Sequence, residues 1–190
     1  MVDFVNSGTI QGPSSGVSQG LYEESSTQQG DVGAMRELAD GRRFRYSYFV
    51  SATAAGLLVS QDVSATAVVE TNDIVTAADA AATKVTITDS GTLGSATADQ
   101  YAGGYLHTTD DAGEGYTYRI RGNTAASSNA VDFTLYDGLV IAVTTATDVA
   151  ITGSLYGSVH GATAGTDYII SGVTNRVMQA SYYGWVQTTG

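Results

Sequence analysis

The sequence has no cysteine, a single proline and only two histidines among its 190 residues. The lack of cysteine excludes a disulfide framework and a thiolate metal site. A zinc site would have to add carboxylates to the two histidines, which is uncommon for structural zinc. The sequence therefore predicts a protein without a metal ion or any other cofactor.

Charged side chains are also scarce, at 14% of the chain, compared with about 25% in an average soluble domain. The net charge is −11, so long-range attraction to nucleic acid is not expected. Four of the eight Lys and Arg fall between Arg36 and Arg45. They either form a local basic patch or alternate along a strand and pair with carboxylates; we expect the pairing, and no nucleic-acid partner.

Long apolar segments are missing as well. No apolar run approaches the ~18 residues that are needed to span a bilayer. The N-terminal residues Met1–Asn6 lack the cationic start and apolar region of a secretory signal. We therefore expect neither a membrane partner nor export.

Among the abundant residues, Thr and Tyr favour strands. The small residues Gly, Ser and Ala, with few long charged side chains beside them, suit close packing of sheets. Apolar and polar residues alternate with a period of two at 43–50, 84–88, 116–121 and 131–136. Further short strands are expected at 57–60, 64–70, 104–108, 148–152, 167–171 and 182–187. Residues 35–38 and 77–83 could each form at most one helical turn. The pattern predicts an all-β protein, an antiparallel β-sandwich or barrel of jelly-roll-like form.

Two turn signals lie between these strands. Asp137-Gly138 separates the alternating run 131–136 from the apolar run 139–143. An Asp-Gly pair between two such runs predicts a hairpin with a type I′ turn, which needs positive φ at both central residues. Gly122-Asn123 predicts a second turn, at the end of the strand over 116–121.

Residues 1–34 are rich in Ser, Gly and Gln and show no sustained period. This composition predicts an extended or flexible N-terminal arm, followed by a single β domain over 35–190. The arm is either a disordered tail or a segment that becomes ordered against a neighbouring subunit. In the second case its apolar residues would contact the partner; these are Phe4, Ile10, Leu21 and Tyr22.

Candidate catalytic groups are few. His107 has Asp110 three residues on, but no G-x-S-x-G motif supplies a nucleophile. His160 has equally little chemistry around it. We therefore expect no catalytic residue and no enzymatic activity.

Two further clusters have a structural and a functional reading. Asp110, Asp111 and Glu114 miss the spacing of a calcium loop, which favours a solvated turn over an ion site. Tyr183 and Trp185 share one face of an expected strand, where they form either a sugar-binding platform or part of the core. We favour the core.

Several stretches resemble structural proteins of tailed bacteriophages. They are 35–46 with 55–58, 103–106 with 113–123, and 184–190. The resemblance implies a capsid decoration (cement) protein that binds the outside of an icosahedral head and stabilises contacts between major capsid subunits. It implies the major capsid protein as partner, a homotrimer, and a place on the outer surface of the virion after synthesis in the host cytoplasm.

Two other functions are compatible with the sequence. A receptor-binding or tail-fibre module of a phage virion would direct its aromatic residues toward a glycan. A small polysaccharide-cleaving enzyme would use a pair among its nineteen Asp and Glu.

Overall fold

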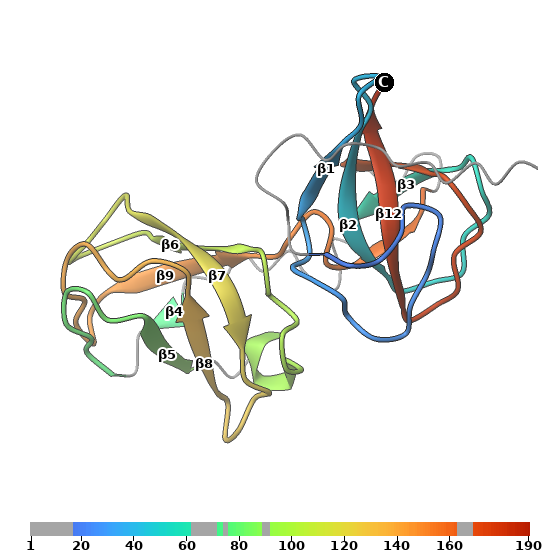
Figure 1. Ribbon diagram of the computed structural model, residues 1–190. Coiled ribbons are helices and arrows are strands. Elements are labelled where there is room, and N and C mark those ends of the chain that lie inside the picture. Colours follow the sequence, from blue (N-terminus) through green and yellow to red (C-terminus); the bar gives the residue numbers. More distant parts are fainter. Residues whose placement is uncertain (1–16, 62–71, 74–75, 89–91, 163–168) are drawn as a thin grey trace, which may run out of the picture. The chain divides into compact units, whose positions relative to one another are not determined.

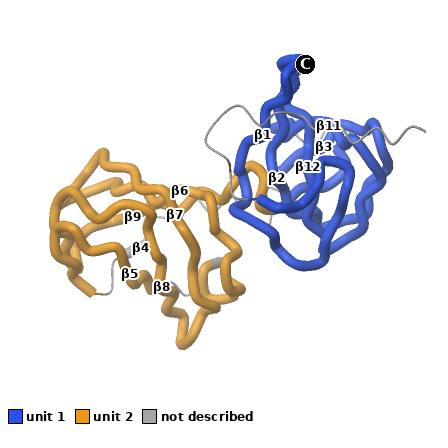
Figure 2. Tube along the Cα trace, in the orientation of Figure 1, with its two compact units in different colours: residues 1–61, 158–190 blue, residues 62–157 orange. Residues whose placement is uncertain are grey.

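The chain folds into two compact β units. The structure is a computed structural model that describes residues 17–61, 72–73, 76–88, 92–162 and 169–190 (Figure 1). Unit 1 comprises residues 1–61 and 158–190, and unit 2 comprises residues 62–157 (Figure 2). In sequence, unit 2 is thus inserted between the two halves of unit 1. This differs from the single domain expected over 35–190, because alternating strands of the same composition occur on both sides of each boundary.

Unit 1 is a closed five-stranded barrel. Its strands follow the order β2–β10–β3–β11–β12, and β12 pairs back with β2. A short strand β1 lies beside the start of β2. The bounds are β1 Met35–Glu37, β2 Arg43–Phe49, β3 Leu58–Gln61, β10 Val159–Gly161, β11 Ile170–Thr174 and β12 Tyr182–Thr189. Every pair is antiparallel except β10 with β2, which is parallel.

The apolar residues that alternate along the strands form the core of this barrel. Phe44 and Tyr46 of β2 are fully buried, as are Val59 of β3 and Trp185 of β12. Gln187 of β12 pairs with Phe44, and Trp185 pairs with Tyr46. The first and last thirds of the chain therefore meet in one sheet, which closes the barrel and leaves it without a long free edge.

Unit 2 is a six-stranded antiparallel sheet in the order β4–β9–β6–β7–β8–β5. The bounds are β4 Asn72–Asp73, β5 Lys84–Thr88, β6 Tyr105–Thr108, β7 Thr117–Asn123, β8 Ala130–Leu135 and β9 Asp148–Thr152, with a 3₁₀ turn η1 at Thr92–Ser95. The sheet curls, so that β4 and β5 lie close together (Figure 1). One face encloses a core that includes Tyr101, Leu106, Ile120, Phe133 and Ile151.

The all-β class expected from the sequence is confirmed. Strands lie at or within a few residues of most predicted positions. The expected strand at 64–70 lies outside the described residues, and that at 167–171 overlaps β11 only from Ile170. Residues 35–38 contain strand β1 instead of a helical turn. Among the described residues, no helix is long and apolar enough to cross a membrane.

The predicted hairpin at Asp137-Gly138 is wrong. Gly138 does not have a positive φ, and the segment after it does not pair with β8. It runs beside residues 78–82, where Leu139 N–H donates to the Ala82 carbonyl at 2.9 Å and Val143 forms a bridge with Ala78. A Cβ on Gly138 would lie 2.6 Å from the Ala81 carbonyl oxygen. Glycine is required here by this close approach, and not by turn geometry.

Candidate interaction surfaces

Residues 17–34 pack on their own barrel. Val17 and Leu21 are buried against Tyr46 and Trp185. This part of the predicted arm thus belongs to unit 1, because its apolar residues find a core within the same chain. Of the four candidate partner contacts, Leu21 is buried, Tyr22 is 52% exposed, and Phe4 and Ile10 lie outside the described residues.

Gln19 fixes this segment to the aromatic core. The Tyr46 hydroxyl donates to Gln19 Oε1 at 2.7 Å, and Trp185 Nε1 donates to the Gln19 carbonyl at 3.2 Å. Gln19 Nε2 in turn donates to the carbonyl of Tyr183 at 2.9 Å. Burial raises the pKa of the Tyr46 phenol. Trp185 is fully buried, so the core reading of Trp185 is confirmed and the sugar-platform reading is wrong for this residue.

Two side chains that follow β11 also hydrogen-bond to the backbone of this segment. Asn175 Nδ2 donates to the Leu21 carbonyl, and Arg176 Nη1 donates to the Tyr22 carbonyl, each at 2.7 Å. Arg176 also forms an ion pair with Glu24 at 3.2 Å. Tyr22 is thus held through its backbone carbonyl, and its side chain remains exposed.

The basic cluster at 36–45 is engaged with local acceptors, as the pairing hypothesis predicted. Arg42 pairs with Asp40 at 2.7 Å and Arg43 pairs with Glu37 at 3.0 Å. The Arg36 guanidinium lies 4.3 Å from the centre of the Trp185 ring. The hydrogen bonds that the backbone and side chain of Arg42 donate to the Asp40 carboxylate lower its pKa. These arginines therefore make contacts within unit 1.

The histidines are bonded to hydroxyls. His107 contacts Thr117 Oγ1 at 3.0 Å and Thr152 Oγ1 at 3.1 Å, and His160 Nε2 contacts Ser60 Oγ at 3.2 Å. Asp111 accepts a hydrogen bond from Thr144 Oγ1 at 2.9 Å, in an exposed turn. Among the described residues, no group of three or more His, Asp or Glu is arranged to hold a metal ion.

A surface that the sequence analysis missed lies on β3 and β11 of unit 1. Leu58 is 56% exposed and pairs across the strands with Val173, which is 37% exposed. Leu57, Ile169 and Ile170, which flank this pair in the chain, are exposed as well. We use the term aliphatic patch for the five exposed residues around the cross-strand pair: Leu57, Leu58, Ile169, Ile170 and Val173. The signal was present in the runs Leu57-Leu58-Val59 and Ile169-Ile170, because consecutive strand residues point to opposite faces and an unbroken apolar run must expose some of them.

Charge is divided unequally between the units. Unit 2 holds twelve of the nineteen Asp and Glu but only three of the eight Lys and Arg, so it carries −9 of the net charge of −11. Unit 1 carries the remaining −2 together with the aliphatic patch. The two units therefore offer chemically different surfaces to a partner.

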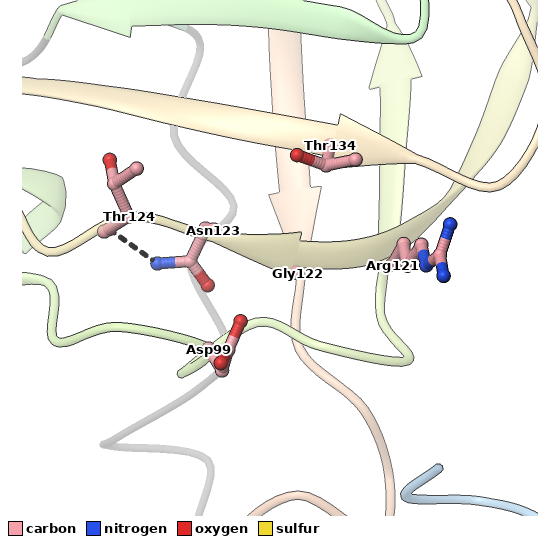
Figure 3. Close-up of a pocket in the computed structure, with 6 residues that line it drawn as sticks. All are labelled: Asp99, Arg121, Gly122, Asn123, Thr124 and Thr134. Carbon is pink, nitrogen blue, oxygen red and sulfur yellow. Dashed lines mark hydrogen bonds between the residues drawn. The ribbon is translucent and has the colours of Figure 1, made fainter.

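Unit 2 has a pocket of about 360 Å³ on the outer side of β7. It is lined by Asp99, Arg121, Gly122, Asn123, Thr124 and Thr134. Figure 3 shows Asp99 and Thr134 on opposite sides of the segment that carries the other four residues, which are the last three of β7 and Thr124 directly after it. The pocket is open to solvent, and Asp99, Arg121 and Thr134 are all exposed.

This pocket lies at a β-bulge in β7. The register of β7 against β8 shifts between Ile120 and Gly122, so Gly122-Asn123 lies within the strand and is not the turn that was predicted. Bulges redirect side chains at sheet surfaces. Asn123 turns inward and is buried, and its Oδ1 accepts the Tyr101 N–H at 2.9 Å. This bond, with the Asp99 N–H to Asn123 carbonyl bond of 2.8 Å, holds the 97–101 loop beside Gly122.

The carboxylate of Asp99 lies directly over Gly122. A Cβ there would lie 2.5 Å from Asp99 Oδ1, so a side chain at position 122 would displace this exposed carboxylate.

Comparison of the chain with protein-family models, with curated proteins and with solved structures gives no match.

Proposed function

We propose that this protein is a capsid decoration protein, which binds the outside of an assembled phage head and stabilises contacts between major capsid subunits. The observation that carries the proposal is the aliphatic patch. Five aliphatic side chains on adjoining strands and their flanking residues are exposed in a chain with few charged residues. Leu58 and Val173 lie opposite each other on paired strands, and exposed apolar side chains that gather in this way favour a protein-interaction site.

The charge distribution indicates which unit docks on the capsid. Unit 1 is nearly neutral and carries the patch, whereas unit 2 carries most of the negative charge. Interface cores are depleted in charge, so unit 1 is the unit that docks on the capsid. The strong negative charge of unit 2 favours hydration and solubility instead of burial in an interface core.

Stabilisation then follows from mass action. A protein that binds the assembled lattice and not its dissociated subunits shifts the equilibrium toward the lattice. The resemblance to phage structural proteins, carried by 35–46 with 55–58, 103–106 with 113–123, and 184–190, supports this assignment and favours a homotrimer. No turnover is part of the proposal.

The test compares heads that carry this protein with heads that lack it. Release of packaged DNA on heating is measured by the fluorescence of a DNA-binding dye, and adsorption to host cells is measured on the same preparations. We expect heads without the protein to release DNA at a lower temperature and to adsorb normally. Equal release temperatures would contradict the proposal.

A receptor-binding or tail-fibre module is the second candidate, and the pocket of unit 2 favours it. In that case heads lacking the protein would fail to adsorb while releasing DNA at an unchanged temperature. The two measurements on one pair of preparations thus separate the candidates.

A further inference from the structure

Arg119 and Arg121 lie two residues apart on the outer side of β7, and both are exposed. They are two of the three cations of a unit with twelve carboxylates. Neither forms an ion pair with a carboxylate of the described residues. The Arg119 guanidinium instead lies 4.8 Å from the centre of the Tyr136 ring. An arginine fork matches a carboxylate with two parallel hydrogen bonds, so this pair is a donor set available to an external carboxylate.

Asp99 supplies an acceptor on the other side of the pocket. Its φ is +58°, a conformation that is uncommon for a residue other than glycine. It is fixed there because its N–H donates to the Asn123 carbonyl and its own carbonyl accepts the Ala102 N–H at 3.1 Å. Its carboxylate is exposed and has no hydrogen-bond donor among the described residues. A neutral hydroxyl group would suit this position.

The remaining features fit a sugar. The pocket volume of about 360 Å³ is at the lower end of the range for small-ligand sites. Thr134 adds an exposed hydroxyl opposite Asp99 (Figure 3). Tyr105, which is 45% exposed, pairs across the strands with Arg119 and continues the surface beyond the pocket. Aromatic faces next to polar groups are suited to the alternating C–H and O–H surfaces of saccharides.

We propose that this pocket binds a saccharide that carries a carboxylate. Arg121, assisted by Arg119, binds the carboxylate; Asp99 and Thr134 bind ring hydroxyls; and Tyr105 contacts the following sugar. A polyanionic chain fits less well, because the net charge of −9 on unit 2 repels it over a Debye length of about 10 Å at 0.1 M salt. The inference goes beyond capsid docking, since it needs no contact with a head.

The test uses the full chain free in solution and two probes that differ only in the carboxylate, galacturonic acid and galactose. Binding is followed by titration of backbone amide NMR signals. We expect signals of 97–101 and 119–124 to shift, with galacturonic acid binding about tenfold more tightly or better, which is the worth of a charge-assisted hydrogen bond. R121Q should remove this preference, R121K should keep part of it, and D99N should weaken both sugars. R43Q, which alters an arginine of unit 1, should change neither.

Several results would overturn the inference. These are no shift with either sugar, equal affinity of the original chain for both, or a preference that survives R121Q. A change in sedimentation coefficient caused by R119Q/R121Q would instead make the arginine pair an interface between copies of this chain. Because no heads are used, failure here leaves the decoration proposal intact.

Discussion

The Tyr46 hydroxyl donates a hydrogen bond of 2.7 Å to Gln19 Oε1 inside unit 1. This bond joins strand β2 to a segment 27 positions earlier in the chain. It has two consequences, one for stability and one for the response to pH.

Removing the hydroxyl should destabilise unit 1. In Y46F the buried oxygen of Gln19 loses its donor, which costs about 1–3 kcal/mol. Y22F removes the hydroxyl of the exposed Tyr22 and should change the free energy of unfolding by less than about 0.5 kcal/mol. Denaturant unfolding followed by Trp185 fluorescence measures both, and equal effects of the two variants would contradict the role given to Gln19.

The same tyrosine should make unit 1 sensitive to alkali. Burial raises the pKa of Tyr46 above its ordinary value, which is about 10. The unfolded state therefore loses this proton first, so the stabilisation is complete below pH ~10 and is lost as pH rises through the folded pKa. Unfolding midpoints measured from pH 8 to 11 should fall less steeply for Y46F than for the original chain.

On the acid side, Asp132 should contribute. Its pKa is lowered by hydrogen bonds from Lys84, 2.7 Å away, and from Thr86. The stabilisation is therefore present above the unfolded pKa of about 3.9 and is lost as pH falls through the lower folded pKa. D132N should flatten the dependence of unit 2 stability on pH in this range. An unchanged slope would show that the Lys84–Asp132 pair is not linked to folding.

Gly138 offers a test of packing. Since a Cβ there would meet the Ala81 backbone at 2.6 Å, G138A should destabilise unit 2 by about 1–3 kcal/mol. The matched control is G161A, whose Cβ would have ordinary contacts of 3.8 Å and more with Thr53. Thermal unfolding of the two variants measures the difference. A G138A chain as stable as G161A would contradict the close approach of the two backbones.

The sequence predicted strands well but predicted their partners poorly. Period-two alternation is a local signal, and it located β2 through Phe44 and Tyr46. Pairing is decided by long-range packing, and so the partner of the segment after Gly138 is 78–82 and not β8. For the same reason the sequence did not predict that unit 2 is inserted into unit 1, or that β10 pairs with β2 in parallel.

The candidate surfaces show the same contrast. Apolar runs in the sequence contain enough information to indicate the aliphatic patch. The pocket could not be predicted, because it depends on a bulge at Gly122 and on a loop held by the buried Asn123. Neither the shift in register nor the bond that the Tyr101 N–H donates to Asn123 Oδ1, 22 positions away, leaves a local pattern.

The most direct test of the central claim is binding of purified protein to heads that lack it, measured by co-sedimentation. The variant L58D/V173D places two charges in the aliphatic patch, and V177D places one on an exposed valine of unit 1 outside it. We expect L58D/V173D to bind at least about tenfold more weakly and V177D to bind like the original chain, with both folded by circular dichroism. Full binding of L58D/V173D would contradict the account.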